Sequence, residues 1–266
     1  MGPSAANMRS AHPPRPSIKP PAIRLPPAAV SLAIGALLWE LAGRLWDAPF
    51  FPPLSNVLGR LLELTLDGAI VADLVDSLEN LVIGFAVSLV LGIGIGMLMG
   101  AYRRVGMALD IYVYALLTAP ALVFAPLFFM LFGLSRIPVI LVVVMYSMFI
   151  MIVNTADAIR AVPPALVEMS RSFCATDRQI FVKVILPAAL PLTMAGARVA
   201  MGRAVKGMIN GEMLIAAVGL GAMVQKAGDA FDSTTVLAIL ILIVVVALVA
   251  TRIVQGYTPE TLQRLW

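Results

Sequence analysis

Long apolar runs separated by short polar segments are the dominant pattern of this chain. The runs lie at residues 27–46, 78–101, 111–133, 137–159, 188–217 and 235–256, and charge, glycine or proline bounds each of them. A helix needs about 20 apolar residues to cross the hydrocarbon core of a bilayer, so each run has the length of a membrane span. The pattern predicts an all-α membrane protein with six transmembrane helices.

The composition supports this class, because 61% of the 266 residues are hydrophobic and only 13% are charged, far from the averages of soluble domains. Six spans leave little chain for a soluble catalytic domain, so an energy source must come from another subunit. Residues 1–26 are basic and rich in proline, without the apolar centre or cleavage site of a signal peptide. We expect a disordered cytoplasmic tail at 1–26 and a membrane domain at 27–266.

The distribution of positive charge predicts the orientation. With the N-terminus in the cytoplasm, twelve Lys and Arg residues lie inside and four lie outside, as the positive-inside rule requires. Both termini and the polar loop 160–187 are then cytoplasmic. The acidic, leucine-containing segment between the first two runs is predicted to form an amphipathic helix on the outer face, as a solvated connector or as a docking surface.

Glycine and proline mark special positions inside the spans. Gly92, Gly96 and Gly100 recur every fourth residue, so they form one helix stripe that permits close contact with a neighbouring helix. A gating hinge is the alternative interpretation. Pro120 and Pro126 predict a kink or a break in the third span, which is tolerated where the backbone lines a cavity.

The fifth span carries four charged residues, Arg198, Arg203, Lys206 and Glu212. Charges at membrane depth are costly and mark functional sites by default. These four lie within half of the helix circumference over about 21 Å of axis, which suits a polar stripe along a translocation path for an anionic solute. Alternatively, Glu212 and Arg198 pair or extend toward opposite faces, while the other two cations bind carbonyl groups.

The loop 160–187 is predicted to form two short helices. Pro163 and Pro164 suit the first turn of a helix, whose apolar anchors and charged flanks fit a groove on a partner protein. Thr176 and Gln179 have the spacing of a capping box that begins a second helix. Pro187 then opens the fifth span.

With these motifs in order, the chain resembles the permease subunits of bacterial ABC importers, in the branch that serves nitrate, sulfonates and taurine. The family signature of Glu-Ala-Ala, a glycine and Ile-x-Leu-Pro appears here as Glu168-Met169-Ser170, Cys174 and Ile185-Leu186-Pro187. Further matches are SLENLVIGF at 77–85, APLFFMLFGLS at 125–135, LPAALPLTMAGARVAMG at 186–202, NGEML at 210–214 and GLG at 219–221.

The resemblance implies a type I ABC importer permease fold in the bacterial inner membrane, working as a homodimer with an ABC ATPase dimer and an external solute-binding protein. A cytoplasmic coupling helix would enter a cleft of the ATPase, with Glu168 as its central residue. The implied coupling residues are Pro164, Leu166, Val167, Glu168, Met169, Ser170, Arg171, Phe173, Cys174 and Ala175. Met169-Ser170 replaces the paired alanines and Cys174 replaces the glycine of a left-handed turn, which cysteine adopts less readily.

The alternatives are a secondary transporter or channel, an intramembrane enzyme, and a scaffold without transport. A secondary transporter would need an internal repeat or its own coupling-ion site, and no repeat is evident. An intramembrane serine or metal protease would need a histidine within the membrane, but His12, the only histidine, lies in the tail. With Cys174 as the single cysteine, we expect no disulfide, metal site, cofactor or catalytic residue, and ATP hydrolysis by a separate subunit.

Overall fold

The computed structural model describes residues 27–46, 48, 50–215 and 218–256, and this part of the chain contains helices and no strands. The predicted tail at 1–26 lies outside the described residues. The elements are α1 (Pro27–Trp46), α2 (Leu54–Leu66), α3 (Ala69–Ala101), α4 (Arg103–Thr118), η1 (Ala121–Phe124), α5 (Ala125–Phe132), α6 (Arg136–Arg160), α7 (Pro164–Ser172), α8 (Asp177–Ile180), η2 (Phe181–Ile185), α9 (Leu186–Ile215), α10 (Leu220–Asp229) and α11 (Ser233–Gly256).

Five helices of the described chain are long and apolar enough to cross a membrane, and a sixth crossing is counted if a bent pair forms one span. The bent pair is Arg103–Thr118 with Ala121–Phe132, which meet at 89°. The all-helical membrane architecture predicted from the sequence is therefore confirmed, with the third span broken.

The predicted break in this span occurs at Pro120. The residue before a proline is disfavoured in the α conformation, and Ala119 accordingly has extended backbone angles where α4 ends. The prediction of a kink or break at Pro126 was wrong. Pro126 lies in the first turn of α5, where the backbone N–H that proline lacks would have no hydrogen-bond acceptor within the helix.

The second span begins earlier than expected. Helix α3 starts at Ala69 and includes Asp73 and Asp76, which precede the apolar run at 78–101. Arg136 at the start of α6 pairs with both Asp76 and Glu79. These ion pairs hold the acidic first turns of α3 against the first turn of α6.

Helices α3, α6 and α9 form the centre of the bundle. An added Cβ at Gly92, Gly96 or Gly100 would lie 2.8 Å or less from a side-chain atom of α6, so the predicted glycine stripe is confirmed as a packing surface. The partners of Gly92 and Gly96 are Met151 and Thr155, at a constant offset in sequence, which means that α3 and α6 run parallel.

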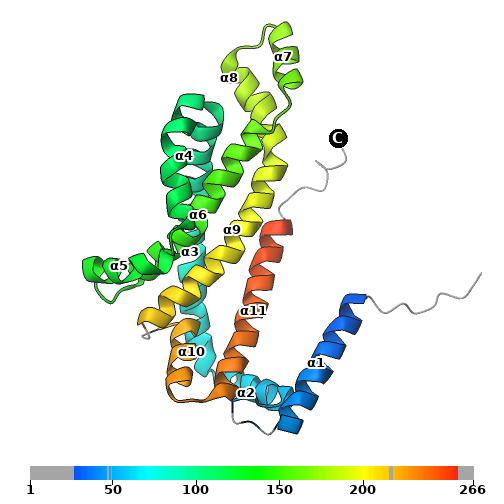
Figure 1. Ribbon diagram of the computed structural model, residues 1–266, viewed down its shortest axis with the longest axis vertical. Coiled ribbons are helices and arrows are strands. Elements are labelled where there is room, and N and C mark those ends of the chain that lie inside the picture. Colours follow the sequence, from blue (N-terminus) through cyan, green and yellow to red (C-terminus); the bar gives the residue numbers. More distant parts are fainter. Residues whose placement is uncertain (1–26, 47, 49, 216–217, 257–266) are drawn as a thin grey trace, which may run out of the picture.

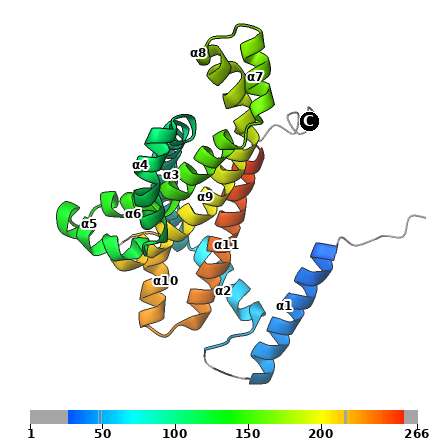
Figure 2. The same ribbon diagram turned by 45° about the horizontal axis from the view of Figure 1, so that its top comes forward.

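The cytoplasmic and outer ends assigned from the sequence correspond to opposite ends of the molecule (Figures 1 and 2). Helices α7 and α8 lie at one end, and the last residues of α11 point toward the same end. Helices α2 and α10 lie at the other. Helix α1 stands apart from the bundle and meets it through α2, where Glu40 accepts hydrogen bonds from the backbone N–H and hydroxyl of Ser55.

Candidate functional site

Helices α7 and α8 project beyond the rest of the bundle as an isolated tip (Figures 1 and 2). The predicted coupling residues have three degrees of exposure: Pro164, Glu168, Met169, Arg171, Phe173 and Cys174 are exposed, Leu166, Val167 and Ala175 are half-buried, and Ser170 is buried. Glu168 makes no hydrogen bond or ion pair through its side chain within the described chain. Its carboxylate is free to receive a donor from another protein.

The turn after α7 has the geometry that a glycine normally provides. Cys174 has a φ of 56° and is in the left-handed conformation. Its N–H donates to the carbonyl of Arg171 over 2.8 Å, and the N–H of Ala175 donates to the carbonyl of Ser170 over 3.2 Å. These two bonds are the Schellman motif that ends many helices. The chain thus keeps the turn with cysteine in the strained position.

The predicted capping box starts α8, as expected. Thr176 accepts a hydrogen bond from the backbone N–H of Gln179, and the side chain of Gln179 accepts one from the backbone N–H of Thr176. Pro187, however, does not open a new helix, because the chain is helical from Asp177 to Leu214 without interruption. The five residues of η2 form a π-helix, whose wider turn accommodates a proline that has no N–H to donate.

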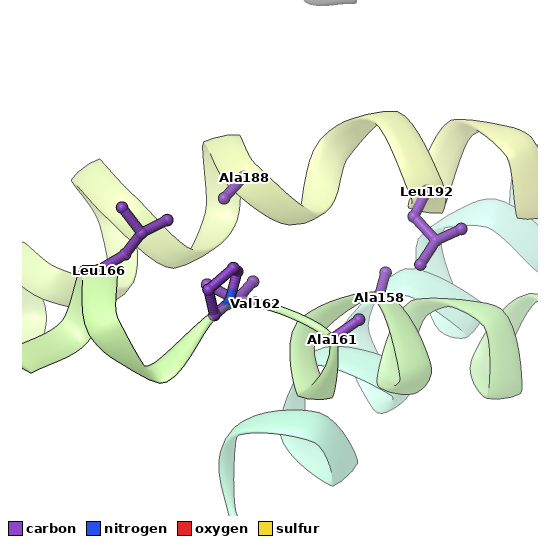
Figure 3. A pocket seen from close by; sticks show the side chains of 7 residues that line it. Ala158, Ala161, Val162, Leu166, Ala188 and Leu192 are labelled. Atoms are coloured by element: carbon purple, nitrogen blue, oxygen red, sulfur yellow. The ribbon is translucent and has the colours of Figure 1, made fainter. Parts of the chain in front are cut away.

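An apolar cavity of about 230 Å³ lies at the base of the tip. Figure 3 shows its lining side chains from the end of α6 and the start of α7, which face Ala188 and Leu192 of α9 across the cavity. Leu166 of α7 reaches into this space, while the exposed face of α7 carries Glu168 and Met169. Leu166 of α7 therefore faces the cavity, whereas Glu168, Met169 and Phe173 are exposed at the outer surface of the tip.

The charged residues of α9 divide into two groups. Arg198 and Arg203 are half-buried, Lys206 is exposed, and none of the three forms an ion pair with a described residue. The alternative in which Arg198 pairs with Glu212 is therefore not observed. Arg198 also has its Nε atom buried without a hydrogen-bond partner in the described chain.

Glu212 is fully buried and joins three helices. Its carboxylate accepts hydrogen bonds from the Ser77 hydroxyl (2.8 Å), the Asn80 amide (3.3 Å) and the backbone N–H of Gly221 (3.0 Å). Side chains of α3 accept hydrogen bonds from two further backbone N–H groups at the start of α10. The N–H of Gly219 donates to the Asp73 carboxylate, and the N–H of Leu220 donates to the Ser77 hydroxyl. Side chains far away in sequence thus cap the first turn of α10.

Two cavities border the polar residues of α9. The first, of about 540 Å³, is lined by Tyr146 of α6, by Lys206 and Asn210 of α9, and by apolar residues of α9 and α11. The second, of about 170 Å³, is lined by Arg203, Tyr146 and the chain around Pro120. The sequence pattern did not single out Tyr146, and it gave Asn210 only as part of the NGEML match, although a tyrosine and an asparagine within apolar spans were a usable signal.

The long apolar helices and the projecting two-helix loop define a multi-pass membrane protein. Residues 89–262 match the family described as binding-protein-dependent transport system inner membrane component. The chain therefore belongs to this family of inner-membrane permeases.

Individual relatives support the assignment. The chain is 31% identical over 209 residues to a probable ABC transporter permease protein of Brucella melitensis, covering 79% of this chain and 85% of the relative. It is 32% identical to a putative aliphatic sulfonates transport permease protein of Bacillus subtilis, covering 75% and 72%. It is 28% identical to the taurine transport system permease protein of Escherichia coli, covering 74% of each chain.

The fold also matches a solved structure, an inward-facing form of the MetNI methionine ABC transporter. The TM-score is 0.56 at 22% identity, and the match covers 68% of this chain and 92% of that one. At this identity the likeness supports the fold alone.

Proposed function

We propose that this chain is the permease subunit of an ATP-driven importer, with α7 as the coupling helix that enters a cleft on an ABC ATPase subunit. The observation that carries the proposal is the projecting α7, whose exposed face holds Glu168 without a partner among the described residues. A second copy of the chain would complete the pore. A solute-binding protein would deliver a small anion, in line with the sulfonate and taurine permeases among its relatives.

The continuous helix from Asp177 to Leu214 supports a simple route for the coupling. At 1.5 Å per residue this helix of 38 residues is about 57 Å long. It begins next to α7 and carries Arg198, Arg203 and Lys206 in its membrane part. When ATP draws two ATPase subunits together, the coupling helices would follow, and each α9 would tilt with them as a rigid element.

The translocation path is part of the same proposal. Arg203 and Lys206 border cavities and have no counterion in the described chain, so a passing anion would supply the missing negative charge. Glu212 is a different case, because its three hydrogen bonds occupy the carboxylate in helix packing. We assign Arg203 and Lys206 to the path and Glu212 to its support.

The test is to purify the tagged chain from its own host in mild detergent, identify the proteins that accompany it, and measure their ATP hydrolysis. A Glu168→Ala variant is compared with Asp67→Ala, which removes an exposed carboxylate at the opposite end of the molecule and serves as the control for retention of the ATPase and not for stimulation by the binding protein. We expect an ATPase to copurify with the native chain and with Asp67→Ala. In Glu168→Ala the ATPase should dissociate or lose its stimulation by loaded binding protein.

The absence of an ATPase from the native preparation under several mild conditions would refute the coupling assignment. A transporter that is driven by an ion gradient would then be the better interpretation. If Glu168→Ala retains the ATPase and its stimulation as the native chain does, the importer assignment stands and Glu168 is not a coupling residue.

A further inference from the structure

We propose that Tyr146, Lys206 and Asn210 form a contact site for an organic anion that has an oxyanion head and a short apolar tail. The proposal rests on the transport function above and adds a class of solute to it. The three side chains line the cavity of about 540 Å³ between α6, α9 and α11. This volume lies in the usual range of small-molecule sites.

The polar side of the cavity is arranged to bind an oxyanion. The Asn210 amide donates to the Tyr146 hydroxyl oxygen over 2.8 Å, which leaves the hydroxyl proton free to donate to a solute. Lys206 precedes Asn210 by one helical turn and therefore lies on the same face of α9. Its ammonium group has no ion-pair partner among the described residues.

The other side chains of the cavity lining are apolar. They belong to Val205, Ile209, Ile243, Val244 and Ala247. An alkyl tail of a few carbon atoms would lose contact with water against these side chains, and burial of each CH₂ group favours binding. An inorganic oxyanion such as nitrate has no tail and would gain only the charged contact.

Tyr146 also belongs to the second cavity, where Arg203 lies. The tyrosine is thus a shared wall with one cation on each side. Gly207 permits this position, because an added Cβ there would lie 2.9 Å from the Cβ of Tyr146. An anion that moves from one cavity to the other passes the tyrosine and stays next to a positive charge throughout.

Binding can be measured without the solute-binding protein. The chain with its ATPase is placed in phosphatidylcholine nanodiscs, and the ¹⁹F line width of 3,3,3-trifluoropropane-1-sulfonate reports binding, with empty discs as the blank. We expect broadening that propane-1-sulfonate reverses and that equal concentrations of nitrate or propylammonium leave largely unchanged. Lys206→Gln should weaken binding about tenfold and Tyr146→Phe about fivefold.

Lys226→Gln is the matched control, since Lys226 is exposed on α10 and lies outside the cavity; its binding should equal that of the native chain. Size-exclusion profiles and retention of the ATPase verify that each variant is folded. A lost ATPase counts against the proposed importer, whereas a retained ATPase without line broadening counts against the binding site.

Three other results would overturn the proposal. The first is unchanged binding in Lys206→Gln, and the second is displacement by nitrate as effective as by propane-1-sulfonate. The third is loss of binding when phosphatidylglycerol replaces phosphatidylcholine at a salt concentration that screens the surface charge of the bilayer. This result would show that the cavity holds the head group of an anionic lipid rather than a solute.

Discussion

Cys174 shows how a single residue can hold a strained position at the tip that we assign to ATPase coupling. A side chain with a Cβ pays about 1–2 kcal/mol in the left-handed conformation, and the two backbone hydrogen bonds of the Schellman motif compensate for that cost. The motif fixes the end of α7, the helix that carries Glu168. The chain therefore keeps the left-handed turn of the permease signature although cysteine stands in place of its glycine.

We expect Cys174→Gly to stabilise this turn by about 0.5–1 kcal/mol. The relief of left-handed strain exceeds the entropy that glycine adds to the unfolded chain. Hydrogen exchange of the Cys174 and Ala175 amides, measured by NMR or mass spectrometry, should slow in the variant. Cys174→Ala keeps the Cβ and should exchange like the native chain; equal slowing in the alanine variant would contradict the strain argument.

Glu212 is the residue whose loss should cost the most stability. Glu212→Ala leaves the Ser77 hydroxyl, the Asn80 amide and the Gly221 N–H without their acceptor, and we expect the free energy of unfolding to fall by about 3 kcal/mol. Glu212→Gln retains one acceptor oxygen and should lose less. The measurement is SDS-induced unfolding in mixed micelles.

Glu168→Ala serves as the control for that experiment, because Glu168 is exposed and its side chain has no partner in the described chain. Its free energy of unfolding should stay within about 0.5 kcal/mol of the native value. If Glu212→Ala unfolds like Glu168→Ala, the buried hydrogen bonds do not hold α10 in place.

At the scale of elements, the parallel packing of α3 on α6 depends on the absence of side chains at the contact. An added Cβ at Gly96 would lie 2.6 Å from the Cβ of Thr155 and 2.7 Å from the carbonyl oxygen of Ile152. Because the second of these atoms is backbone, the helices themselves must separate to make room. The same stripe also brings the Ser88 and Ser147 hydroxyl groups within 2.7 Å of each other.

We therefore expect Gly96→Ala to lower the free energy of unfolding by about 1–3 kcal/mol. Gly94→Ala lies on the same helix with nothing within 4 Å of the added Cβ, and its better helix propensity should raise stability by up to about 1 kcal/mol. SDS titration of the two variants side by side tests the pair. A gain in stability for Gly96→Ala would refute the close-contact interpretation.

Local chemistry made several elements predictable. The glycine stripe, the capping box at Thr176 and the break at Pro120 each follow from a few neighbouring residues. The cap of α10 was not predictable from the sequence. Asp73 and Ser77 accept hydrogen bonds from the N–H groups of Gly219 and Leu220, which lie 146 and 143 residues further along the chain. The start of α3 was missed for a related reason. Its acidic residues belong to the segment that was predicted as a separate outer-face helix, and their ion pairs with Arg136 of α6 cannot be seen in the local sequence.

On the scale of the whole molecule, the two ends differ in charge as well as in shape. The end with α7 and α8 holds Arg171 and Arg178, and α4 begins there with Arg103 and Arg104. The opposite end holds α2 and the acidic first turns of α3. From the positive-inside rule we therefore expect the tip to face the cytoplasm.

The natural single cysteine tests this orientation directly. Cys174 is exposed at the tip, so a membrane-impermeant maleimide should label it in inverted membrane vesicles and leave it unlabelled in right-side-out vesicles. In a Cys174→Ser background, a cysteine at the exposed Gly228 at the far end of α10 should give the reverse pattern. Adding the ATPase to inverted vesicles should slow the labelling of Cys174, because the same tip would be covered. Labelling of Cys174 from the outside would reverse the topology and place α7 out of reach of any cytoplasmic ATPase.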